Sequence, residues 1–178
     1  MSFATIALGA NLPSPVGSPE ATLTAAAERL TTLGRVTARS SLYSTAPVDF
    51  PNQPRFLNAA AALETQLSPR DLLNGLLAIE LDFGRDRAAS PPNGPRTLDL
   101  DILFYGDMVL TAAGLEIPHP RLAARAFVLV PLNEIAPDLR DPRSGKTVAQ
   151  MLQALADATE QDAVAKIDGD HWTAQITS

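Results

Sequence analysis

The sequence predicts an α+β fold, a ferredoxin-like αβ sandwich (βαββαβ core) with a mostly antiparallel sheet and C-terminal additions. The first observation is the order of its patterned segments, which run strand, helix, strand, strand, helix, strand. The second is size, because 178 residues, 46% of them hydrophobic, can bury one sizeable core. Neither a repeat nor a linker interrupts the chain, so we expect residues 1–178 to form a single domain.

The first half of the chain supplies one helix and three strands. Ser18 can accept a hydrogen bond from the first turn of a helix, and Pro19 fits the first helical position because its nitrogen carries no hydrogen. Apolar or alternating runs bounded by turn residues indicate the strands. The predicted elements are a strand at 3–8, a loop at 9–17, a helix from Ser18 to Gly34, and strands at 35–46 and 56–66.

The second half begins with a helix start of the same kind, in which Ser68 precedes Pro69 and Asp71. This helix is predicted to reach Phe83. The elements predicted after it are a strand at 98–104, a short strand after the turn at 106–109, partly helical structure at 121–135, and an amphipathic helix near 147–159.

Charge and composition restrict the class of partner. There are 20 acidic and 14 basic residues, a net charge of −6, which argues against a general nucleic-acid-binding surface. Five of the 14 basic residues nevertheless lie between positions 85 and 125, which favours a small anionic ligand. There are no cysteines, no signal-peptide pattern, and no apolar run near the ~18 residues that span a bilayer. We therefore expect a cytoplasmic protein that binds neither nucleic acid nor membrane.

The segment 94–101, GPRTLDLD, is the strongest candidate for a functional site. Strand alternation puts Asp99 and Asp101 on one face, about 6.5–7 Å apart, where both carboxylates can serve magnesium. Arg96 supplies a planar cation that suits phosphate. A lone acidic pair more often lies on a solvated face, so the neighbouring arginines are what favour a metal-bound polyphosphate. Leu103 is predicted to share the face of the two aspartates. The opposite, apolar face is predicted to hold Leu98, Leu100, Ile102 and Phe104.

Two loops are further candidates. The stretch 85–95, RDRAASPPNGP, has the composition of a mobile lid over a charged ligand, and an ordinary surface loop is the equally simple alternative. Residues 144–147, SGKT, resemble the end of a phosphate-binding P-loop. That motif requires a glycine five residues before Gly145, and position 140 is arginine, so we expect no phosphate site there.

Six segments run in order along the chain as ALGANL (7–12), SLYSTAPV (41–48), QPRFLNAAAALET (53–65), IELDFGRDR (79–87), GPRTLDLDILFYGD (94–107) and IPHPRLAARAFVLVPLNEIAP (117–137). Together they resemble the 6-hydroxymethyl-7,8-dihydropterin pyrophosphokinase family. The resemblance implies transfer of pyrophosphate from ATP to the hydroxymethyl group of the pterin, releasing AMP, in folate biosynthesis. It also implies a single pyrophosphokinase domain with a motif-bearing core of about 4–140.

The same resemblance implies site residues at matching motif positions, with ATP as co-substrate and two Mg²⁺ ions held by Asp99 and Asp101. The residues implied in catalysis are Arg85, Arg87, Arg96, Asp99 and Asp101. Those implied in ATP binding are Glu80, Arg87, Arg96, the backbone near Ile102, His119 and Arg125. Those implied in pterin binding are Thr45, Ala46, Pro47, Val48, Phe56, Asn58, Asn93 and Phe127, with the two phenylalanines on either side of the ring.

Simpler alternatives exist for some of these roles. Phe56 and Phe127 fit ordinary core packing, and His119 fits a loop histidine without a special role. Asn58 is harder to explain in this way, because an unpartnered amide in an apolar strand costs on the order of 1 to 3 kcal/mol. Asn93 stands where many family members carry a bulky aromatic that packs on the pterin when the lid closes, a departure that affects lid closure and pterin affinity.

Two functions of other classes are the alternatives. A non-catalytic pterin- or nucleotide-binding relative would have lost the acidic pair or the lid arginines, and both are intact. An interaction module with a chance metal site is disfavoured because arginines, aspartates and a histidine cluster in the same motifs. We expect a monomer whose partners are the two small-molecule substrates.

Overall fold

The helices and strands follow the predicted order. The structure is a computed structural model and describes residues 1–47, 52–158, 164–169, 172 and 174–176. The strands are β1 (Ser2–Ala10), β2 (Arg35–Arg39), β3 (Leu42–Thr45), β4 (Phe56–Thr65), β5 (Asp99–Tyr105), β6 (Leu110–Ala112), β7 (Leu115–Ile117), β8 (Ala165–Ile167) and β9 (Gln175–Ile176). The helices are α1 (Pro19–Arg29), α2 (Pro69–Asp82), α3 (Ala126–Ile135) and α4 (Val148–Ala158), with short 3₁₀ helices η1 (Leu30–Thr32) and η2 (Leu122–Ala124).

The main sheet has the order β5-β1-β4-β2-β9, and β3 pairs with β4 and with β8. All of these pairings between the described strands are antiparallel. Strands β6 and β7 form a separate hairpin. With one helix between β1 and β2 and another between β4 and β5, this arrangement confirms the ferredoxin-like αβ sandwich.

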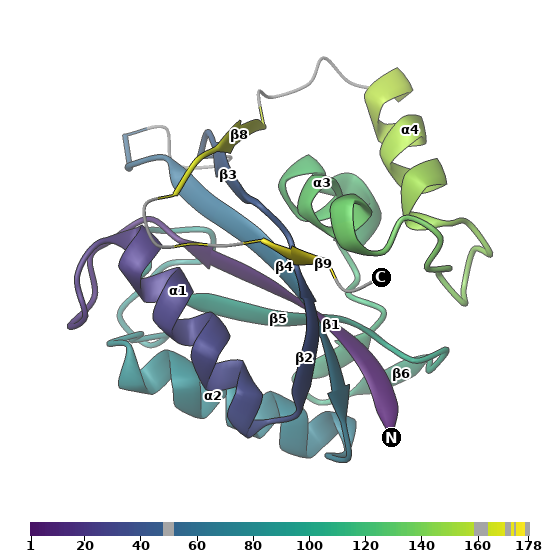
Figure 1. Cartoon of the computed structure of the whole chain (residues 1–178), viewed down its shortest axis with the longest axis horizontal. Coiled ribbons are helices and arrows are strands. Elements are labelled where there is room, and N and C mark those ends of the chain that lie inside the picture. Colours follow the sequence, from purple (N-terminus) through teal and green to yellow (C-terminus); the bar gives the residue numbers. More distant parts are fainter. Residues whose placement is uncertain (48–51, 159–163, 170–171, 173, 177–178) are drawn as a thin grey trace.

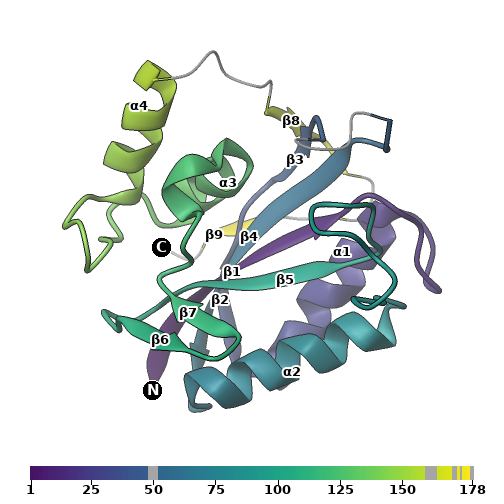
Figure 2. The ribbon, with the colours of Figure 1, turned by 180° about the vertical axis from the view of Figure 1, so that it is seen from behind.

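The helices cover both faces of the sheet. Helices α1 and α2 lie together on one face, whereas α3 lies on the other face with α4 beside it (Figures 1 and 2). Each layer has its own buried cluster: Leu23 and Leu72 belong to the first, and Leu129 and Met151 belong to the second. Both the first and second helices begin as predicted, since Ser18 and Ser68 accept hydrogen bonds from the backbone N–H groups of their first turns.

The predicted faces of 98–104 are right through Leu103 and wrong for Phe104. Ile6 pairs with Ile102 but Thr5 pairs with Phe104, so Leu103 is an extra residue in β5. The bulge reverses the alternation, and Phe104 is buried with Leu103 in the cluster under α3. A regular period of two cannot anticipate this change, because the apolar residues on both sides of the bulge look alike in sequence.

The single strand predicted at 35–46 is two strands, β2 and β3, separated at Ser40 and Ser41. Ser40 pairs with β4 in an unusual way: its backbone N–H donates to Ala60 O, and its side-chain Oγ accepts from Ala60 N–H, both at 2.9 Å. The hydroxyl thus takes the place of a backbone carbonyl, and β4 stays paired across the break. This substitution explains why alternating residues do not produce one continuous strand.

The SGKT segment starts a helix. Thr147 Oγ1 accepts from Gln150 N–H at 3.1 Å, and Gln150 Oε1 accepts from Thr147 N–H at 2.9 Å, which is the reciprocal pattern of a capping box. The predicted helix near 147–159 is therefore confirmed from Val148 to Ala158, and Thr159 lies outside the described residues. Among the helices of the described residues, none is long and apolar enough to cross a membrane.

Candidate active site

A cavity of about 480 Å³ is bordered by the end of β1, the end of β3, the starts of β4 and β5, and the residues around η2 and α3. Its lining is formed mostly by apolar side chains with a few charged groups, as is usual for a small-molecule site. The predicted site residues that line it are Thr45, Ala46, Phe56, Asn58, Asn93, Arg96, Asp99, Asp101, Arg125 and Phe127.

The register of the sheet explains why residues far apart in sequence meet here. Gly9 in β1 is paired with Asn58 on one side and with Asp99 on the other. Because all three strands are antiparallel, the end of β1 adjoins the starts of both neighbours. A Cβ on residue 9 would lie 3.1 Å from Asn58 Oδ1, so the missing side chain leaves space between the amide and the carboxylate.

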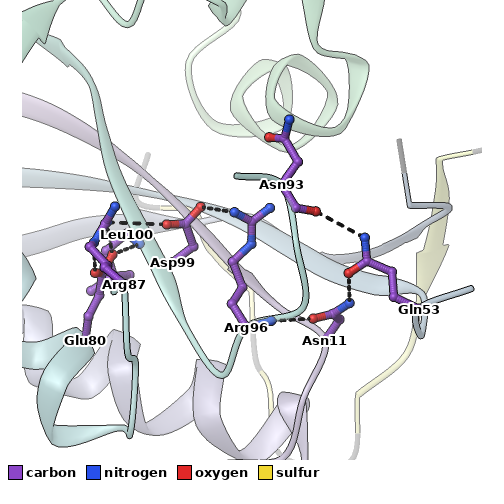
Figure 3. Close-up of polar contacts among 8 residues, drawn as sticks. All are labelled: Asn11, Gln53, Glu80, Arg87, Asn93, Arg96, Asp99 and Leu100. Carbon is purple, nitrogen blue, oxygen red and sulfur yellow. Dashed lines mark hydrogen bonds and ion pairs between the residues drawn. The ribbon is translucent and has the colours of Figure 1, made fainter. Parts of the chain in front are cut away.

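Asp99 lies between two arginines. Its Oδ1 is 3.5 Å from Nη2 of Arg87, and its Oδ2 is 3.3 Å from Nη1 of Arg96 (Figure 3). Its neighbour Asp101 is half-buried, and burial followed by the charge of Asp99 raises the pKa of Asp101 to about 7. The two carboxylates therefore repel each other, and added positive charge would stabilise them.

Glu80 anchors one of these arginines. Its side chain is only 1% exposed, yet it accepts two hydrogen bonds from Arg87, at 2.9 Å from Nε and 2.8 Å from Nη2. It also accepts from the backbone N–H of Leu100 at 2.8 Å. Burial raises the pKa of Glu80 above its ordinary value, and the contacts with Arg87 and Leu100 offset only part of that rise. Burial lowers the pKa of Arg87, but the hydrogen bonds and the charge of Glu80 outweigh burial and raise it overall, so the pair favours the charged form of Arg87.

Arg85 is a buried cation with unused donors. The residue is 8% exposed, and its buried Nε and Nη1 have no hydrogen-bond partner among the described residues. Burial lowers its pKa, while the nearby charge of Asp99 raises it. An unpaired buried guanidinium is costly, so the site favours an anion that can accept these hydrogen bonds.

His119 is held by two contacts with the chain around it. Its backbone N–H donates to Leu103 O in the bulge at 3.0 Å, and its Nδ1 accepts from the backbone N–H of Arg121 at 3.2 Å. Burial, and then the charges of Arg125 and Arg121, lower the pKa of His119 to about 4. At neutral pH the ring is therefore uncharged, and the proton resides on Nε2 because Nδ1 is the acceptor.

The candidate pterin residues form a buried polar edge with aromatic groups around it. Asn58 is 7% exposed and donates from Nδ2 to Thr45 Oγ1 at 2.7 Å. The guanidinium of Arg96 lies 4.9 Å from the ring centre of Phe56, and that of Arg125 lies 5.4 Å from the ring centre of Phe127. In this structure an arginine guanidinium therefore lies over each aromatic ring, and a flat ligand that stacks on these rings would displace it.

Not all of the predicted residues line the cavity. Pro47, Glu80, Arg85, Arg87, Ile102 and His119 are not among its lining residues, and Val48 lies outside the described residues. Glu80 and Arg87 are nevertheless connected to Asp99 by the ion pairs above. The side chain of Ile102 is buried in the cluster under α1 and α2, so only its backbone can face a ligand.

Sequence reasoning missed Asn11 and Gln53. Asn11 is 2% exposed, donates from Nδ2 to Gln53 Oε1 at 3.0 Å, and accepts from the backbone N–H of Arg96 at 2.9 Å. Gln53 donates to the carbonyl of Asn93 at 3.1 Å. The available signal was a polar residue placed directly after an apolar strand, which in a core position requires partners.

The two aspartates suit magnesium by the chemistry of their oxygens. No group of three or more His, Asp or Glu that could hold a metal occurs in the part of the chain that the structure describes. Magnesium commonly takes only one or two carboxylates and completes its shell with water and phosphate oxygens. A pair of carboxylates in a cavity, with arginines nearby, therefore fits a magnesium ion that arrives with a polyphosphate.

Comparison with known proteins decides the family. Residues 5–137 match the model of the family described as "7,8-dihydro-6-hydroxymethylpterin-pyrophosphokinase (HPPK)". The chain belongs to this family. The matched range contains all of the predicted site residues and ends at the close of α3. Members of the family transfer pyrophosphate from ATP to hydroxymethyldihydropterin in folate biosynthesis, so they are ATP-dependent pyrophosphokinases.

Curated pyrophosphokinases of this family are similar over most of the chain. The protein named 2-amino-4-hydroxy-6-hydroxymethyldihydropteridine pyrophosphokinase is 48% identical in Pseudomonas aeruginosa over 149 residues, 84% of this chain and 89% of that protein. Its namesake in Haemophilus influenzae is 42% identical over 157 residues, 88% of this chain and 95% of that protein. The Synechocystis protein of the same name is 55% identical over 105 residues, 59% of this chain and 53% of that protein.

Solved structures support the fold alone, because their sequences are distant. The crystal structure of Plasmodium falciparum HPPK-DHPS matches with a TM-score of 0.70 at 14% identity. The match covers 93% of this chain and 50% of the Plasmodium chain. This chain therefore spans about half the length of the Plasmodium and Synechocystis proteins that it matches.

Proposed function

We propose that this chain carries out the family's reaction, transfer of the pyrophosphoryl group of ATP to the hydroxymethyl group of 6-hydroxymethyl-7,8-dihydropterin, releasing AMP. The register around Gly9 carries the proposal, because it sets the amide of Asn58 and the carboxylate of Asp99 on the two strands that flank β1. A pterin held by Asn58 would then lie beside phosphates held near Asp99. Holding two reactants in this way replaces a bimolecular encounter by an oriented one.

Asp99 and Asp101 are proposed to hold two Mg²⁺ ions. Both carboxylates line the cavity, and the pKa of Asp101 is raised by burial and then by the charges of Asp99 and Glu80, so bound divalent cations would stabilise its charged form. When bound, magnesium would neutralise the triphosphate charge and make the pterin hydroxyl more acidic. A magnesium ion needs no third protein ligand here, because water and phosphate oxygens complete its coordination.

The arginines are proposed to change partners when the substrates bind. Arg87 and Arg96 are paired with carboxylates in this structure, and phosphate oxygens would take over their hydrogen bonds. Arg85 has two buried donors that a phosphate oxygen can satisfy. Arg125 faces the same cavity, and the Nε2–H of neutral His119 supplies a further donor. Donors fixed in this way stabilise the charge that develops during transfer.

The pterin is proposed to bind with its edge on Asn58 and its ring between Phe56 and Phe127. Because Asn58 Nδ2 already donates to Thr45, its Oδ1 beside Gly9 is the group that would accept a hydrogen bond from the pterin. Backbone groups from Thr45 to Val48 and the lid residue Asn93 would complete this pocket. The ring would replace Arg96 and Arg125 on the two aromatic faces.

Adenine is proposed to bind at the open edge of β5. The N–H of Leu100 points away from β1, at the edge of the sheet, and donates to Glu80. Backbone groups two residues apart in a strand point the same way. Ile102 therefore presents its own N–H and C=O to that edge. A neighbouring donor and acceptor of this kind complement the edge of an adenine ring.

The lid, residues 85–95, is proposed to close over the bound phosphates and exclude water, which otherwise competes with the pterin hydroxyl as acceptor. We also propose that residues 1–178 act as one pyrophosphokinase domain, as a monomer, in the cytoplasm where ATP is maintained. Light scattering during size-exclusion chromatography tests the monomer directly, since a dimer would double the mass from the 18.9 kDa of one chain.

Product analysis tests the proposed reaction. The protein is incubated with ATP, Mg²⁺ and the pterin, and nucleotides and pterins are resolved by chromatography. AMP and a pterin carrying two phosphates are expected, in equal amounts. ADP as the product, or ATP consumption that does not depend on the pterin, would overturn the proposal. The exposed Asp107 gives a matched control, because Asp107→Asn removes an aspartate outside the cavity and should leave AMP formation unchanged.

A further inference from the structure

Asn11 is a buried junction between segments that are far apart in sequence. It follows directly after β1, and its side-chain Nδ2 donates to Gln53 Oε1 and to Pro54 O, each at 3.0 Å. Its Oδ1 accepts from the backbone N–H of Arg96 at 2.9 Å. The backbone N–H groups of Asn11 and Leu12 both donate to the carbonyl of Arg96 at 3.1 Å. Every donor and the acceptor of this amide are thus used, which fixes its orientation.

These contacts join the pterin side of the cavity to its phosphate side. Gln53 leads directly into β4, which carries Phe56, and Gln53 also donates to the carbonyl of Asn93 at the end of the lid. Figure 3 shows the resulting chain of contacts, which runs from Gln53 through Asn11 and Arg96 to Asp99. Both the N–H and the C=O of Arg96 are hydrogen-bonded, so the backbone is fixed and the side chain can change partners only by rotating about its own bonds.

The side chain of Arg96 lies at the boundary of the two substrate regions. Its guanidinium is 4.9 Å from the ring centre of Phe56 and 3.3 Å from Asp99 Oδ2. A flat ligand on Phe56 has to displace this cation, and a nucleotide phosphate offers the cation another partner. A phosphate that draws Arg96 away from the ring therefore lowers the cost of binding the flat ligand, which is a coupling free energy between two sites.

We propose that Asn11 is a positioning residue that couples the two substrates, by holding the backbone of Arg96 against the loop before β4 while its side chain exchanges Phe56 for phosphate. The inference rests on the proposed binding regions, and it adds a residue outside the cavity lining to them. Without the hydrogen bonds from Asn11, the backbone of Arg96 would move together with its side chain. A bound nucleotide would then draw the Arg96 guanidinium away from the ring of Phe56 less effectively.

Calorimetry of both ligands tests the proposal. Pterin affinity is measured with and without Mg²⁺ and a non-hydrolysable ATP analogue, and the ratio of the two dissociation constants is the coupling factor. Nucleotide affinity measured with and without pterin must give the same factor. Asn11→Asp keeps the acceptor for Arg96 N–H but removes the donors to Gln53 and Pro54. We expect it to lower the coupling factor about tenfold, with less than about a threefold change in affinity for nucleotide alone.

Gln53→Glu keeps the acceptor for Asn11 and loses the donor to Asn93 O, so a smaller reduction is expected. This variant decides the question if Asn11→Asp does not fold. Asn52→Ala, at an exposed neighbouring amide, is the matched control and should keep the wild-type factor. An unchanged factor in the folded variants, or no coupling in the wild type, overturns the proposal. Asn58→Ala and Arg96→Ala test the binding regions separately, because their affinities for a single ligand fall only if those regions are right.

Discussion

The carboxylate of Glu80 and the guanidinium of Arg87 are joined by two hydrogen bonds, although one residue is buried at the end of α2 and the other belongs to the lid. The same guanidinium is 3.5 Å from Asp99. In this structure, the lid arginine is thus held by Glu80 and by Asp99, one of the two candidate metal ligands. To reach a phosphate, Arg87 has to exchange one anion for another, so most of its interaction with the nucleotide belongs to the closed state.

Arg87→Ala should therefore lower the rate of transfer much more than the affinity for ATP. Loss of a donor to developing charge costs about 100-fold or more in rate, whereas the affinity should change less than about fivefold. Single-turnover kinetics and calorimetry with ATP measure the two quantities. Equal losses in both would mean that Arg87 is an ordinary ground-state contact. Arg29→Ala breaks the exposed pair with Asp82 and is the control, with no expected effect on rate.

Asp99→Ala and Asp101→Ala should abolish transfer and leave the fold intact, because both side chains face the cavity and not the core. At pH 8, Asp101→Asn should raise the melting temperature of the magnesium-free protein by about 2–4 °C, because it removes a charge that burial and then Asp99 disfavour by about 1 kcal/mol. The sign follows from the raised pKa of Asp101: an unfolded aspartate loses its proton at about pH 4 and the folded one at about pH 7, so stability falls as the pH rises between these values and the loss is complete at pH 8. Near-normal turnover in either alanine variant would contradict the metal assignment.

The order of elements was predictable because each signal was local. Ser18 and Ser68 mark helix starts within a single turn, and the alternation of 98–102 reports which side of the strand faces the core. Neither signal depends on distant parts of the chain. The sandwich then follows because only a few arrangements pack two helices on an antiparallel sheet.

What could not be predicted depends on partners from other segments. The bulge at Leu103 is defined only against β1, and the break after Arg39 is stabilised by a hydroxyl that bonds to Ala60. Asn11 is recognised as a junction only once the Gln53 loop and Arg96 are brought together. In the same way, the acidic pair and its arginines were found by motif, but the ion pair between Glu80 and Arg87 required the folded chain.

Asn58→Ala should weaken pterin binding about 10- to 100-fold and change ATP affinity little. The amide is buried, and its loss removes the acceptor proposed for the pterin and leaves Thr45 Oγ1 without its donor. Calorimetry with each ligand separately measures the difference. Thr45→Val is the matched variant, because it removes the hydroxyl that orients the amide and should produce a smaller loss. Parallel losses for ATP and pterin would indicate a general disturbance of the sheet.

His119 should make the protein less stable in mild acid. Its pKa is lowered to about 4 in the folded chain, by burial and then by the charges of Arg125 and Arg121, and an unfolded histidine has a pKa of about 6.5. Between these values the unfolded state binds more protons, so the stability contributed by the neutral ring is complete above pH 6.5 and is lost as the pH falls toward 4.

Between pH 7 and pH 5, wild-type protein should therefore lose on the order of 1 kcal/mol more free energy of unfolding than His119→Gln, after allowance for partial exposure of the ring. Urea unfolding at the two pH values measures this difference. If His119→Gln loses as much stability as the wild type, then His119 is protonated in the folded state, and its role as a neutral donor from Nε2 is wrong.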